Sequence, residues 1–374
     1  MVNGKQIIAG FFLAGSVQLT AVELPLEKIQ LPAGFSITIF AEGLEDARQM
    51  AMGDEGVLFV GSRKIGNVYA VIDSDGDYQA DVSYVIDSGL SMPSGLAFRE
   101  GALYVGAVNR ILRYENIEQR LDDPPQPVVV SDAFPSDTHH GWKYLGFGPD
   151  GMLYVPVGAP CNICDESGYA SIKRMRVDGT GIEDYALGVR NSVGFTWHPD
   201  SEELWFTDNG RDLMGDEIPS CELNHAPRPG MHFGYPYCHQ GDLPDPEFGQ
   251  GKVCQDYVAP VVKLGPHVAP LGLKFYTGNQ FPADYHKQLF ITEHGSWNRT
   301  QKIGYRIKLV RFDADGKFAS QEVFASGWLQ DQDSWGRPND ILMLDDGSML
   351  VSDDKAAVIY RISYQDPAAQ IPSS

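Results

Sequence analysis

Two pairs of residues with useful chemistry stand one repeat apart in the sequence. His139 and His140 come just before GWKYLGFGPDG, and Arg190 and Asn191 come just before SVGFTWHP. Histidine can act as an acid or a base near neutral pH, and a guanidinium beside an amide forms an array of donors for a carboxylate or quinone oxygen. These residues predict a site that binds an anion and moves a proton. A histidine pair alone, however, is more often part of a hydrogen-bonded loop.

Three further segments carry side chains of similar kinds. FTDNGRDLMGDEIPSCELN is rich in the hard oxygen ligands that calcium prefers, or else it is a solvated acidic loop. ITEHGSWNRTQKIGYRI and SWGRPNDILML add histidine, asparagine and arginine. Cationic side chains thus recur at equivalent places in a chain whose net charge is -21. This pattern predicts an axial site for a multiply anionic small molecule.

A second acidic segment lies earlier in the chain. DSDGDYQAD places carboxylates at Asp73, Asp75, Asp77 and Asp81, as at the start of a calcium loop. It lacks the glycine at the sixth position and the glutamate at the twelfth position of such a loop. Calcium binding and a solvated turn are therefore both open at this point.

A short pattern recurs six times and must position these residues. Each copy has an apolar pair, a turn rich in aspartate and glycine, and then an apolar run, as in LGFGPDGMLYV. The runs end at Val60, Val105, Val155, Phe206, Ile291 and Val351. Hairpins repeated at such intervals predict an all-β protein, a six-bladed β-propeller. We expect residues 35–40 (FSITIF) to pair with residues 358–364 (VIYRISY) and close the ring.

Two separate β domains are the alternative, but no linker-like segment divides the repeats. We expect residues 22–374 to form a single propeller domain. The longest interval, 85 residues, contains an insertion at about 209–270 that is rich in proline, glycine and histidine. Insertions of this kind usually build a binding face.

The five cysteines favour an oxidising compartment. Cys161 with Cys164 and Cys238 with Cys254 are the expected disulfides, which leaves Cys221 unpaired. A redox or zinc half-site at the Cys-x-x-Cys is the alternative, although no second Cys-x-x-Cys or His-x-x-x-His completes a zinc set.

The first residues and the net charge indicate where the protein works. Residues 1–21 have one lysine, an apolar run and a small-residue end, which is the order of a signal peptide, and a buried strand is the alternative. We expect a periplasmic or secreted protein that starts near Val22, and the loss of Lys5 then changes the net charge from -21 to -22. The acidic surface makes nucleic acid an unsuitable partner, and no later apolar segment is long enough to span a membrane.

The chain resembles the soluble pyrroloquinoline quinone (PQQ)-dependent glucose and sorbosone dehydrogenases, also called aldose sugar dehydrogenases. The similarity extends from about Gly34 to Tyr364 and is most specific in HHGWKYLGFGPDG, GVRNSVGF, the CELN to HFGYP stretch, PHVAPLGLKFY and GRPNDI. APCNIC and EHGSWNR resemble the sorbosone dehydrogenase-like members. The resemblance implies a six-bladed propeller that holds PQQ and Ca2+.

The resemblance also implies roles for individual residues. His140 matches the catalytic base, and Arg190 matches the residue that stabilises charge on the quinone oxygen. Cofactor contacts are implied for Arg190, Asn191, His267, Trp297, Arg299 and Arg337. Calcium ligands are implied for Gly210 and Arg211, and for Glu222 and Phe233 at a second, structural calcium. If the backbone is extended here, neighbouring residues alternate faces and His139 points away from the axis.

Two departures from the glucose-oxidising relatives bear on the substrate. Asn339 stands where they have a second arginine, and Ala159 stands where they have an aspartate. The identity of the sugar is therefore not carried over. We expect oxidation of a sugar or sugar-derived hydroxyl or hydrated aldehyde, with electrons passed to an external cytochrome or quinone. A calcium-dependent propeller lactonase and a non-catalytic extracellular binding propeller are the alternatives.

Overall fold

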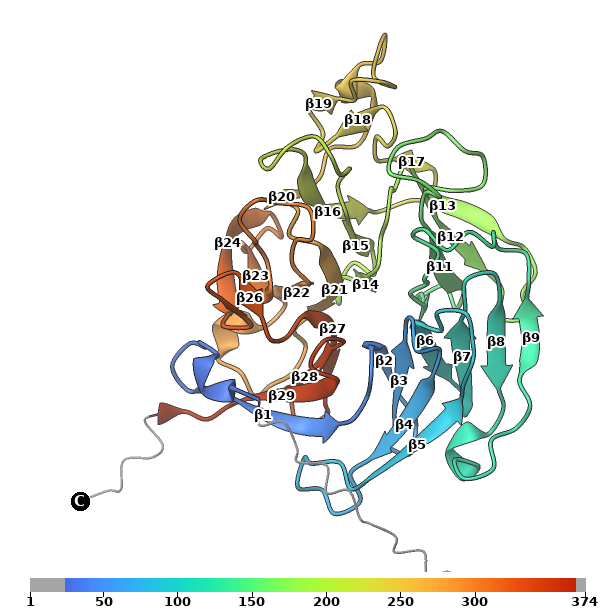
Figure 1. Cartoon of the computed structure of the whole chain (residues 1–374), viewed down its shortest axis with the longest axis vertical. Coiled ribbons are helices and arrows are strands. Elements are labelled where there is room, and N and C mark those ends of the chain that lie inside the picture. The colour runs from blue at the N-terminus through green and yellow to red at the C-terminus, as the bar shows by residue number, and fades with distance from the viewer. Residues whose placement is uncertain (1–23, 368–374) are drawn as a thin grey trace, which may run out of the picture.

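The computed structural model describes residues 24–367 of the 374-residue chain. Six small antiparallel sheets stand around a central axis, so the prediction of an all-β six-bladed propeller is confirmed (Figure 1). The expected signal peptide, residues 1–21, and the start near Val22 lie outside the described residues and stay predictions. Among the described residues, no helix has the length and apolar character needed to cross a membrane.

Each blade is built from four antiparallel strands. Blades one and two comprise β2 (Ala47–Met52), β3 (Leu58–Ser62), β4 (Val68–Ile72), β5 (Val82–Asp87), β6 (Gly95–Arg99), β7 (Ala102–Gly106), β8 (Ile111–Tyr114) and β9 (Val128–Ser131). Blades three and four comprise β10 (Gly146–Phe147), β11 (Leu153–Val157), β12 (Ser171–Met175), β13 (Glu183–Leu187), β14 (Phe195–Trp197), β15 (Leu204–Asp208), β16 (Ser220–Ala226) and β20 (Val262–Pro266). Blades five and six comprise β21 (Pro270–Phe275), β22 (Leu289–Glu293), β23 (Arg306–Phe312), β24 (Phe318–Ala325), β27 (Pro338–Met343), β28 (Met349–Asp353), β29 (Val358–Tyr364) and β1 (Phe35–Glu42).

The second strand of every blade explains the sequence repeat. All residues of β3, β7, β11, β15, β22 and β28 are buried, because neighbouring blades cover both faces of these strands. A strand buried on both faces has a nearly continuous apolar run rather than an alternating one. The hairpin turns use the expected chemistry: Gly151 has φ +75°, and the Asp150 carboxylate accepts from the backbone N–H of Met152 at 3.1 Å.

The hydrophobic core is divided into six clusters, one between each pair of adjacent blades. The cluster between blades five and six is rich in aromatic residues and includes Tyr276, Phe290 and Trp328. Each blade therefore packs mainly against its two neighbours.

The chain termini close the ring as expected. β1 pairs antiparallel with β29, from Phe35 opposite Tyr364 to Glu42 opposite Val358, and completes blade six as its outer strand (Figure 1). This pairing covers the edge that β29 would otherwise expose.

The segment predicted as an insertion, 209–270, contains two regular blade-four strands, β16 and β20. The added structure lies between them and projects from the ring (Figure 1). Its short strands are β17 (Met231–His232), parallel to β13, and the pair β18 (Cys238–His239) and β19 (Leu243–Pro244). β25 (Leu329–Gln330) and β26 (Asp333–Ser334) form another small pair. Single 3-10 turns occur at Leu26–Lys28, Ile117–Gln119, Cys254–Asp256 and Ala283–Tyr285.

Both expected disulfides, Cys161–Cys164 and Cys238–Cys254, are present, and Cys221 is a buried free thiol. The second disulfide ties β18 to the 3-10 turn at Cys254–Asp256 within the projecting segment.

Candidate functional site

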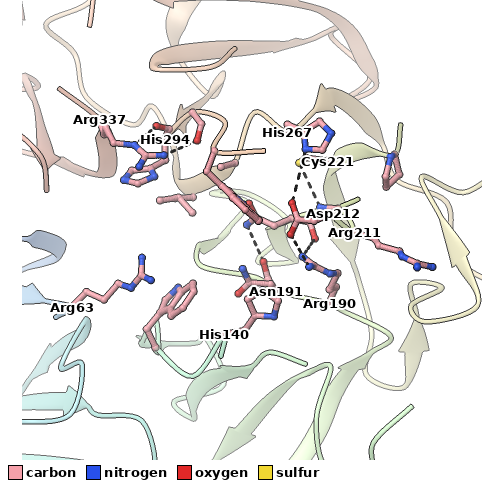
Figure 2. Close-up of a pocket in the computed structure, with 18 of the residues that line it drawn as sticks. Arg63, His140, Arg190, Asn191, Arg211, Asp212, Cys221, His267, His294 and Arg337 are labelled. Atoms are coloured by element: carbon pink, nitrogen blue, oxygen red, sulfur yellow. Dashed lines mark hydrogen bonds and ion pairs between the residues drawn. The ribbon is translucent and has the colours of Figure 1, made fainter. Parts of the chain in front are cut away.

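A cavity of about 430 Å³ opens on one face of the ring (Figure 2). Most of its wall comes from loops that precede the first strands of blades and from loops that follow the second strands, and Arg48 is contributed by β2. The lining residues used below are Arg48, Arg63, His140, Trp142, Arg190, Asn191, Gly210, Arg211, Asp212, His267, His294, Trp297 and Arg337. The structure thus brings the sequence-predicted residues His140, Arg190, Asn191, Gly210, Arg211, His267, Trp297 and Arg337 to one cavity.

His140 is buried in the cavity wall and is suited to act as a neutral base. Its Nδ1 lies 2.8 Å from the Ala159 carbonyl oxygen, which can only accept, so Nδ1 carries the proton and Nε2 is left as an acceptor. Burial lowers the pKa of His140 well below its ordinary value, and repulsion by Arg190 and His139 lowers this pKa further. The imidazole is therefore neutral at the pH of most biological reactions.

The expectation that His139 points away from the axis depended on an extended backbone, and this condition is not met. His140 has φ +51°, so the backbone is not extended at this point, and the two imidazole rings lie 4.1 Å apart. His139 is exposed and does not line the cavity, but it contacts the ring of His140. The residue types around His140 do not predict its positive φ.

The Arg190–Asn191 pair is held by a carboxylate at the end of β15. The backbone N–H groups of Arg190 and Asn191 donate to the two oxygens of Asp208 at 2.8 and 2.7 Å. The Asn191 side-chain amide has no hydrogen bond to another described residue and faces the cavity. Burial raises the pKa of Asp208 to about 6.

Asn162 fixes the guanidinium of Arg190. Its carbonyl and side-chain oxygens accept from Arg190 Nε at 2.9 Å and Nη2 at 2.8 Å. Asn162 also exchanges two hydrogen bonds with the backbone of Asp212, each 2.9 Å long. Asn162 sits inside the loop closed by Cys161–Cys164, so this disulfide supports a wall of the cavity.

Arg337 in blade six is held in the same way as Arg190, by a carboxylate at the end of a blade's second strand. Its backbone N–H donates to Asp353, the last residue of β28, at 2.8 Å. Its guanidinium donates to the carbonyl oxygens of His294 and Gly295 at 3.0 and 2.7 Å. Both acceptors are neutral, so the positive charge of Arg337 has no direct anionic partner.

Sequence reasoning missed several cavity residues, among them Arg48, Arg63, Trp142, Asp212 and His294. Arg48 and His294 both bind Asp354, with contacts of 2.5 and 2.8 Å, and burial lowers the pKa of His294 to about 4. One sequence signal could have indicated where the cavity lies. The second strand of several blades ends in an acidic residue, and two of these residues, Asp208 and Asp353, accept a hydrogen bond from the backbone N–H of a cavity arginine.

His267 and Trp297 form part of the cavity wall, whereas Arg299 does not. The Nε2 of His267 donates to the Gly215 carbonyl at 2.7 Å, and Trp297 is 75% exposed. The guanidinium of Arg299 donates to the Asp216 carbonyl and the Glu217 carboxylate. It therefore links the loop after β22 to the loop between β15 and β16, outside the cavity.

A smaller cavity adjoins the first and has oxygen atoms that can ligate a cation. It has room for about one small ion, roughly 10 Å³, and its wall includes Asp208, Glu222 and the Phe233 region. Burial and the charge of Asp208 raise the pKa of Glu222 to about 8. The Oδ1 of Asn224, next to Glu222, is buried without a hydrogen-bond donor. A cation bound in this cavity would allow both Asp208 and Glu222, which line it, to be ionised.

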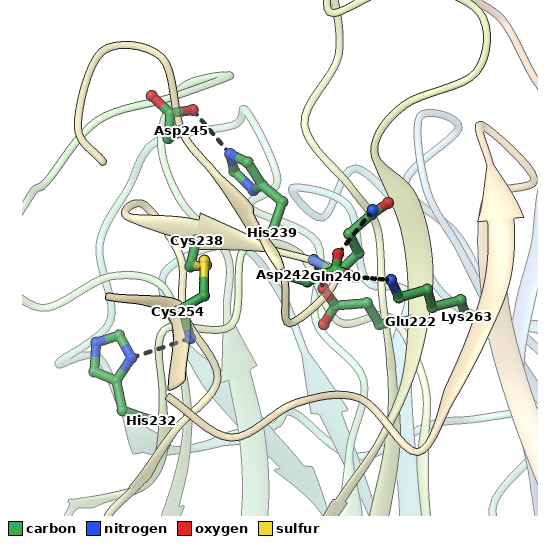
Figure 3. Close-up of a disulfide and its surroundings, with 10 residues drawn as sticks. Glu222, His232, Cys238, His239, Gln240, Asp242, Asp245, Cys254 and Lys263 are labelled. Carbon is green, nitrogen blue, oxygen red and sulfur yellow. Dashed lines mark hydrogen bonds and ion pairs between the residues drawn. A yellow bond between two sulfur atoms is a disulfide. The ribbon is translucent and has the colours of Figure 1, made fainter. Parts of the chain in front are cut away.

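Gly210 and Arg211 line both cavities. The Arg211 side chain is cationic and is bound to Asp245 and Glu247, and a guanidinium offers no acceptor to a cation, so only the backbone carbonyl of Arg211 can act as a calcium ligand. Figure 3 shows Glu222 near the Cys238–Cys254 disulfide and Asp245 bound to His239.

The earlier acidic segment forms a compact turn on the surface. Carboxylate oxygens of Asp73, Asp75 and Asp81 lie within 4.8 Å of one another. These residues also accept backbone hydrogen bonds within the turn, for example from Gly76 and Ser74. The structure favours neither the calcium loop nor the solvated turn.

The fold is a six-bladed propeller with an arginine-lined cavity on one face of the ring. The model of the TrAA12-like family matches residues 29–245 and 242–365. An uncharacterized protein of Borreliella burgdorferi is 32% identical over 96% of this chain and 97% of its own length. The chain therefore belongs to the TrAA12-like family, and the resemblance to soluble PQQ-dependent sugar dehydrogenases is confirmed at the level of the family.

Two solved structures show the same fold. The calcium structure of the Trichoderma reesei carbohydrate-active enzyme of family AA12 has a TM-score of 0.81 at 20% identity and covers 93% of this chain and 100% of that one. The holo form of the pyranose dehydrogenase PQQ domain from Coprinopsis cinerea has a TM-score of 0.77 at 18% identity and covers 90% of this chain and 97% of that domain.

Proposed function

We propose that the protein is a PQQ- and calcium-dependent dehydrogenase that oxidises a sugar or sugar-derived hydroxyl or hydrated aldehyde. The observation that carries this proposal is a buried, neutral His140 in a cavity lined by five arginines. Membership of the TrAA12-like family and the PQQ domain named among the similar structures support the proposal.

The residues present fit a polycarboxylate cofactor. Arg337 donates only to neutral carbonyls, and the Asn191 amide has no partner among the described residues. PQQ would be held by Arg190, Asn191, His267, Trp297 and Arg337. The Gly210 and Arg211 carbonyls would hold one calcium, and Glu222 with the Phe233 backbone would hold a structural one. When bound, PQQ supplies the acceptor for a hydride and calcium supplies a Lewis acid beside it.

The chain itself handles the proton and the developing charge. Nε2 of His140 takes the proton from the substrate hydroxyl as hydride leaves the same carbon. Arg190 is fixed by Asn162 and Asp212, so its guanidinium can stabilise negative charge without reorganising. The electrons then pass to an external cytochrome or quinone. We propose that this takes place in the periplasm or outside the cell, which the two disulfides support.

The test is reconstitution of the purified protein with PQQ and CaCl2. We expect a shift in the absorption spectrum of the quinone and dye-linked sugar oxidation. Lactone hydrolysis without bound PQQ would identify a lactonase instead, and sugar binding without turnover or quinone binding would identify a binding module.

A further inference from the structure

Arg63 differs from the other arginines of the cavity in its partners. Arg48, Arg190 and Arg211 each contact a carboxylate, and Arg337 contacts two carbonyls. The Arg63 side chain has no hydrogen bond or ion pair with any residue in the described part of the chain, and its Nε is buried without an acceptor. Its one specific contact is with Trp142, whose ring centroid lies 4.1 Å from the guanidinium carbon.

This arrangement leaves a positive charge free to bind a ligand. Burial and repulsion by Arg48, partly offset by the attraction of Asp46 and Asp354, lower the pKa of Arg63 to about 10, so the group stays protonated at neutral pH. The indole covers one face of the guanidinium, and the two Nη groups have no hydrogen-bond partner among the described residues. A planar guanidinium whose edge is open matches a carboxylate, which it can bind through two parallel hydrogen bonds.

Arg63 lies in the part of the cavity that contains His140, the proposed base. The Trp142 ring meets the His140 ring edge-on, with centroids 5.9 Å apart, and Arg63 is among the charges that lower the pKa of His140. Figure 2 shows Arg63 reaching into the cavity from the side opposite Arg190, with His140 between them. A sugar whose reacting hydroxyl contacts His140 can therefore direct another substituent toward Arg63.

We propose that Arg63, supported by Trp142, binds a carboxylate group of the substrate. The substrate class of this site is then an acidic sugar, such as a uronic acid. This inference rests on the proposed function. The carboxylate takes no part in the chemistry: the hydroxyl proton goes to His140 and the hydride to the quinone, as for a neutral sugar. Arg63 and Arg337 have no ion-pair partner among the described residues, so they place uncompensated positive charge at the cavity of a protein of net charge -21, which favours an anionic substrate there.

The test compares sugars that differ only in the carboxylate. Glucuronate and glucose, and galacturonate and galactose, are offered to the PQQ-loaded protein and to its Arg63→Gln and Arg63→Lys variants. Arg113→Gln is the matched control, because Arg113 also lies over an aromatic ring, Tyr104, but pairs with Glu115 and does not line the cavity. The PQQ affinity of each apoprotein is measured by titration.

We expect the wild type to prefer each uronic acid over its neutral partner. Arg63→Gln should lower kcat/KM for the uronic acids about 10- to 100-fold, as expected for a lost charged hydrogen bond. It should leave kcat/KM for the neutral sugars and the PQQ affinity within about threefold, and Arg63→Lys should recover part of the loss. Arg113→Gln should change none of these values.

Two outcomes would overturn the assignment. If Arg63→Gln lowers kcat/KM equally for acidic and neutral sugars and also weakens PQQ binding, Arg63 binds a carboxylate of the cofactor. Equal kcat/KM values of the wild type for acidic and neutral sugars would refute the acidic substrate while leaving the proposed dehydrogenase intact. If no sugar is oxidised, the proposed function fails. Protection of the apoprotein by glucuronate but not glucose in thermal unfolding, lost in Arg63→Gln, then still tests the carboxylate position.

Discussion

His140 illustrates how much one residue depends on its surroundings. Its proton is fixed on Nδ1 by the Ala159 carbonyl, so a single lone pair on Nε2 is available for a substrate hydroxyl. We expect His140→Ala to lower kcat about 100-fold or more while PQQ affinity stays within a few-fold, because a lost general base slows chemistry without removing a cofactor contact. Dye-linked turnover and PQQ titration measure the two quantities.

His139→Ala is the control for this variant, since His139 does not line the cavity. We expect only a small change, because His139 is just one of several charges that lower the pKa of His140. The pH profile adds a second check. A lowered pKa means that His140 loses its proton at a lower pH, so the acidic limb of kcat/KM should lie below pH 6.5. Full activity in His140→Ala with loss in His139→Ala would exchange their roles.

Glu222 allows the proposed structural calcium to be tested without any assay of turnover. Calcium should raise the Tm of the wild type by a few degrees, because a ligand that binds the folded state alone stabilises it. Glu222→Gln should lose this response while its calcium-free Tm is nearly unchanged near pH 7, since the pKa of about 8 keeps the calcium-free Glu222 carboxyl largely protonated and the substitution replaces one neutral group by another. Differential scanning calorimetry of both proteins with EDTA and with CaCl2 measures the change in Tm that calcium causes. An undiminished calcium response in Glu222→Gln would place the ion elsewhere.

Among the structural elements, the loop closed by Cys161–Cys164 has the clearest functional role. It presents Asn162 to both Arg190 and Asp212, so opening the loop should free the Arg190 guanidinium. We expect the Cys161→Ser/Cys164→Ser double variant to bind PQQ about tenfold or more weakly, with a stability loss of only ~2 kcal/mol for so short a loop. Fluorescence titration and urea unfolding measure the two effects.

Asn162→Ala should reproduce the loss of PQQ affinity with both cysteines intact. If Asn162→Ala weakens PQQ binding and the double serine variant does not, the disulfide has no positioning role. If both variants bind PQQ normally, the Arg190 guanidinium is held by Asn209 and Asp212 alone.

The elements also show what the sequence could and could not predict. The blades follow from local signals, namely Asp and Gly turns and runs of apolar residues, so the hairpins and the closing pair β1–β29 could be predicted. Much of the cavity wall depends on contacts between distant residues. Arg48 meets Asp354 across 306 residues of sequence, and Asn162 meets Arg190 across 28. Such contacts depend on the way blades stack, which no local pattern records.

At the scale of the whole molecule, stability depends on closing the ring. The Phe35 ring of β1 lies 4.8 Å from that of Phe281 and 5.0 Å from those of Phe324 and Tyr364. We expect Phe35→Ala to destabilise the whole propeller by about 3 kcal/mol, because the partly buried ring packs against residues of both blade five and blade six.

Thr38→Ala is the matched control, because Thr38 lies on the exposed face of the same strand. It should change the free energy of unfolding by no more than ~0.5 kcal/mol. Equal effects of the two variants in urea unfolding would show that the closing strand contributes through its backbone pairing alone.

The pairing of Phe35 with Tyr364 also brings the two ends of the described propeller side by side on its outer rim, whereas the cavity is built from loops around the axis. Circular permutation is therefore geometrically favourable: a short linker could join these neighbouring ends, and new ends could open in a surface turn of another blade. For the same reason, a tether to an electrode at residue 367 would leave from the rim, so the molecule could be immobilised without covering the opening through which substrate enters.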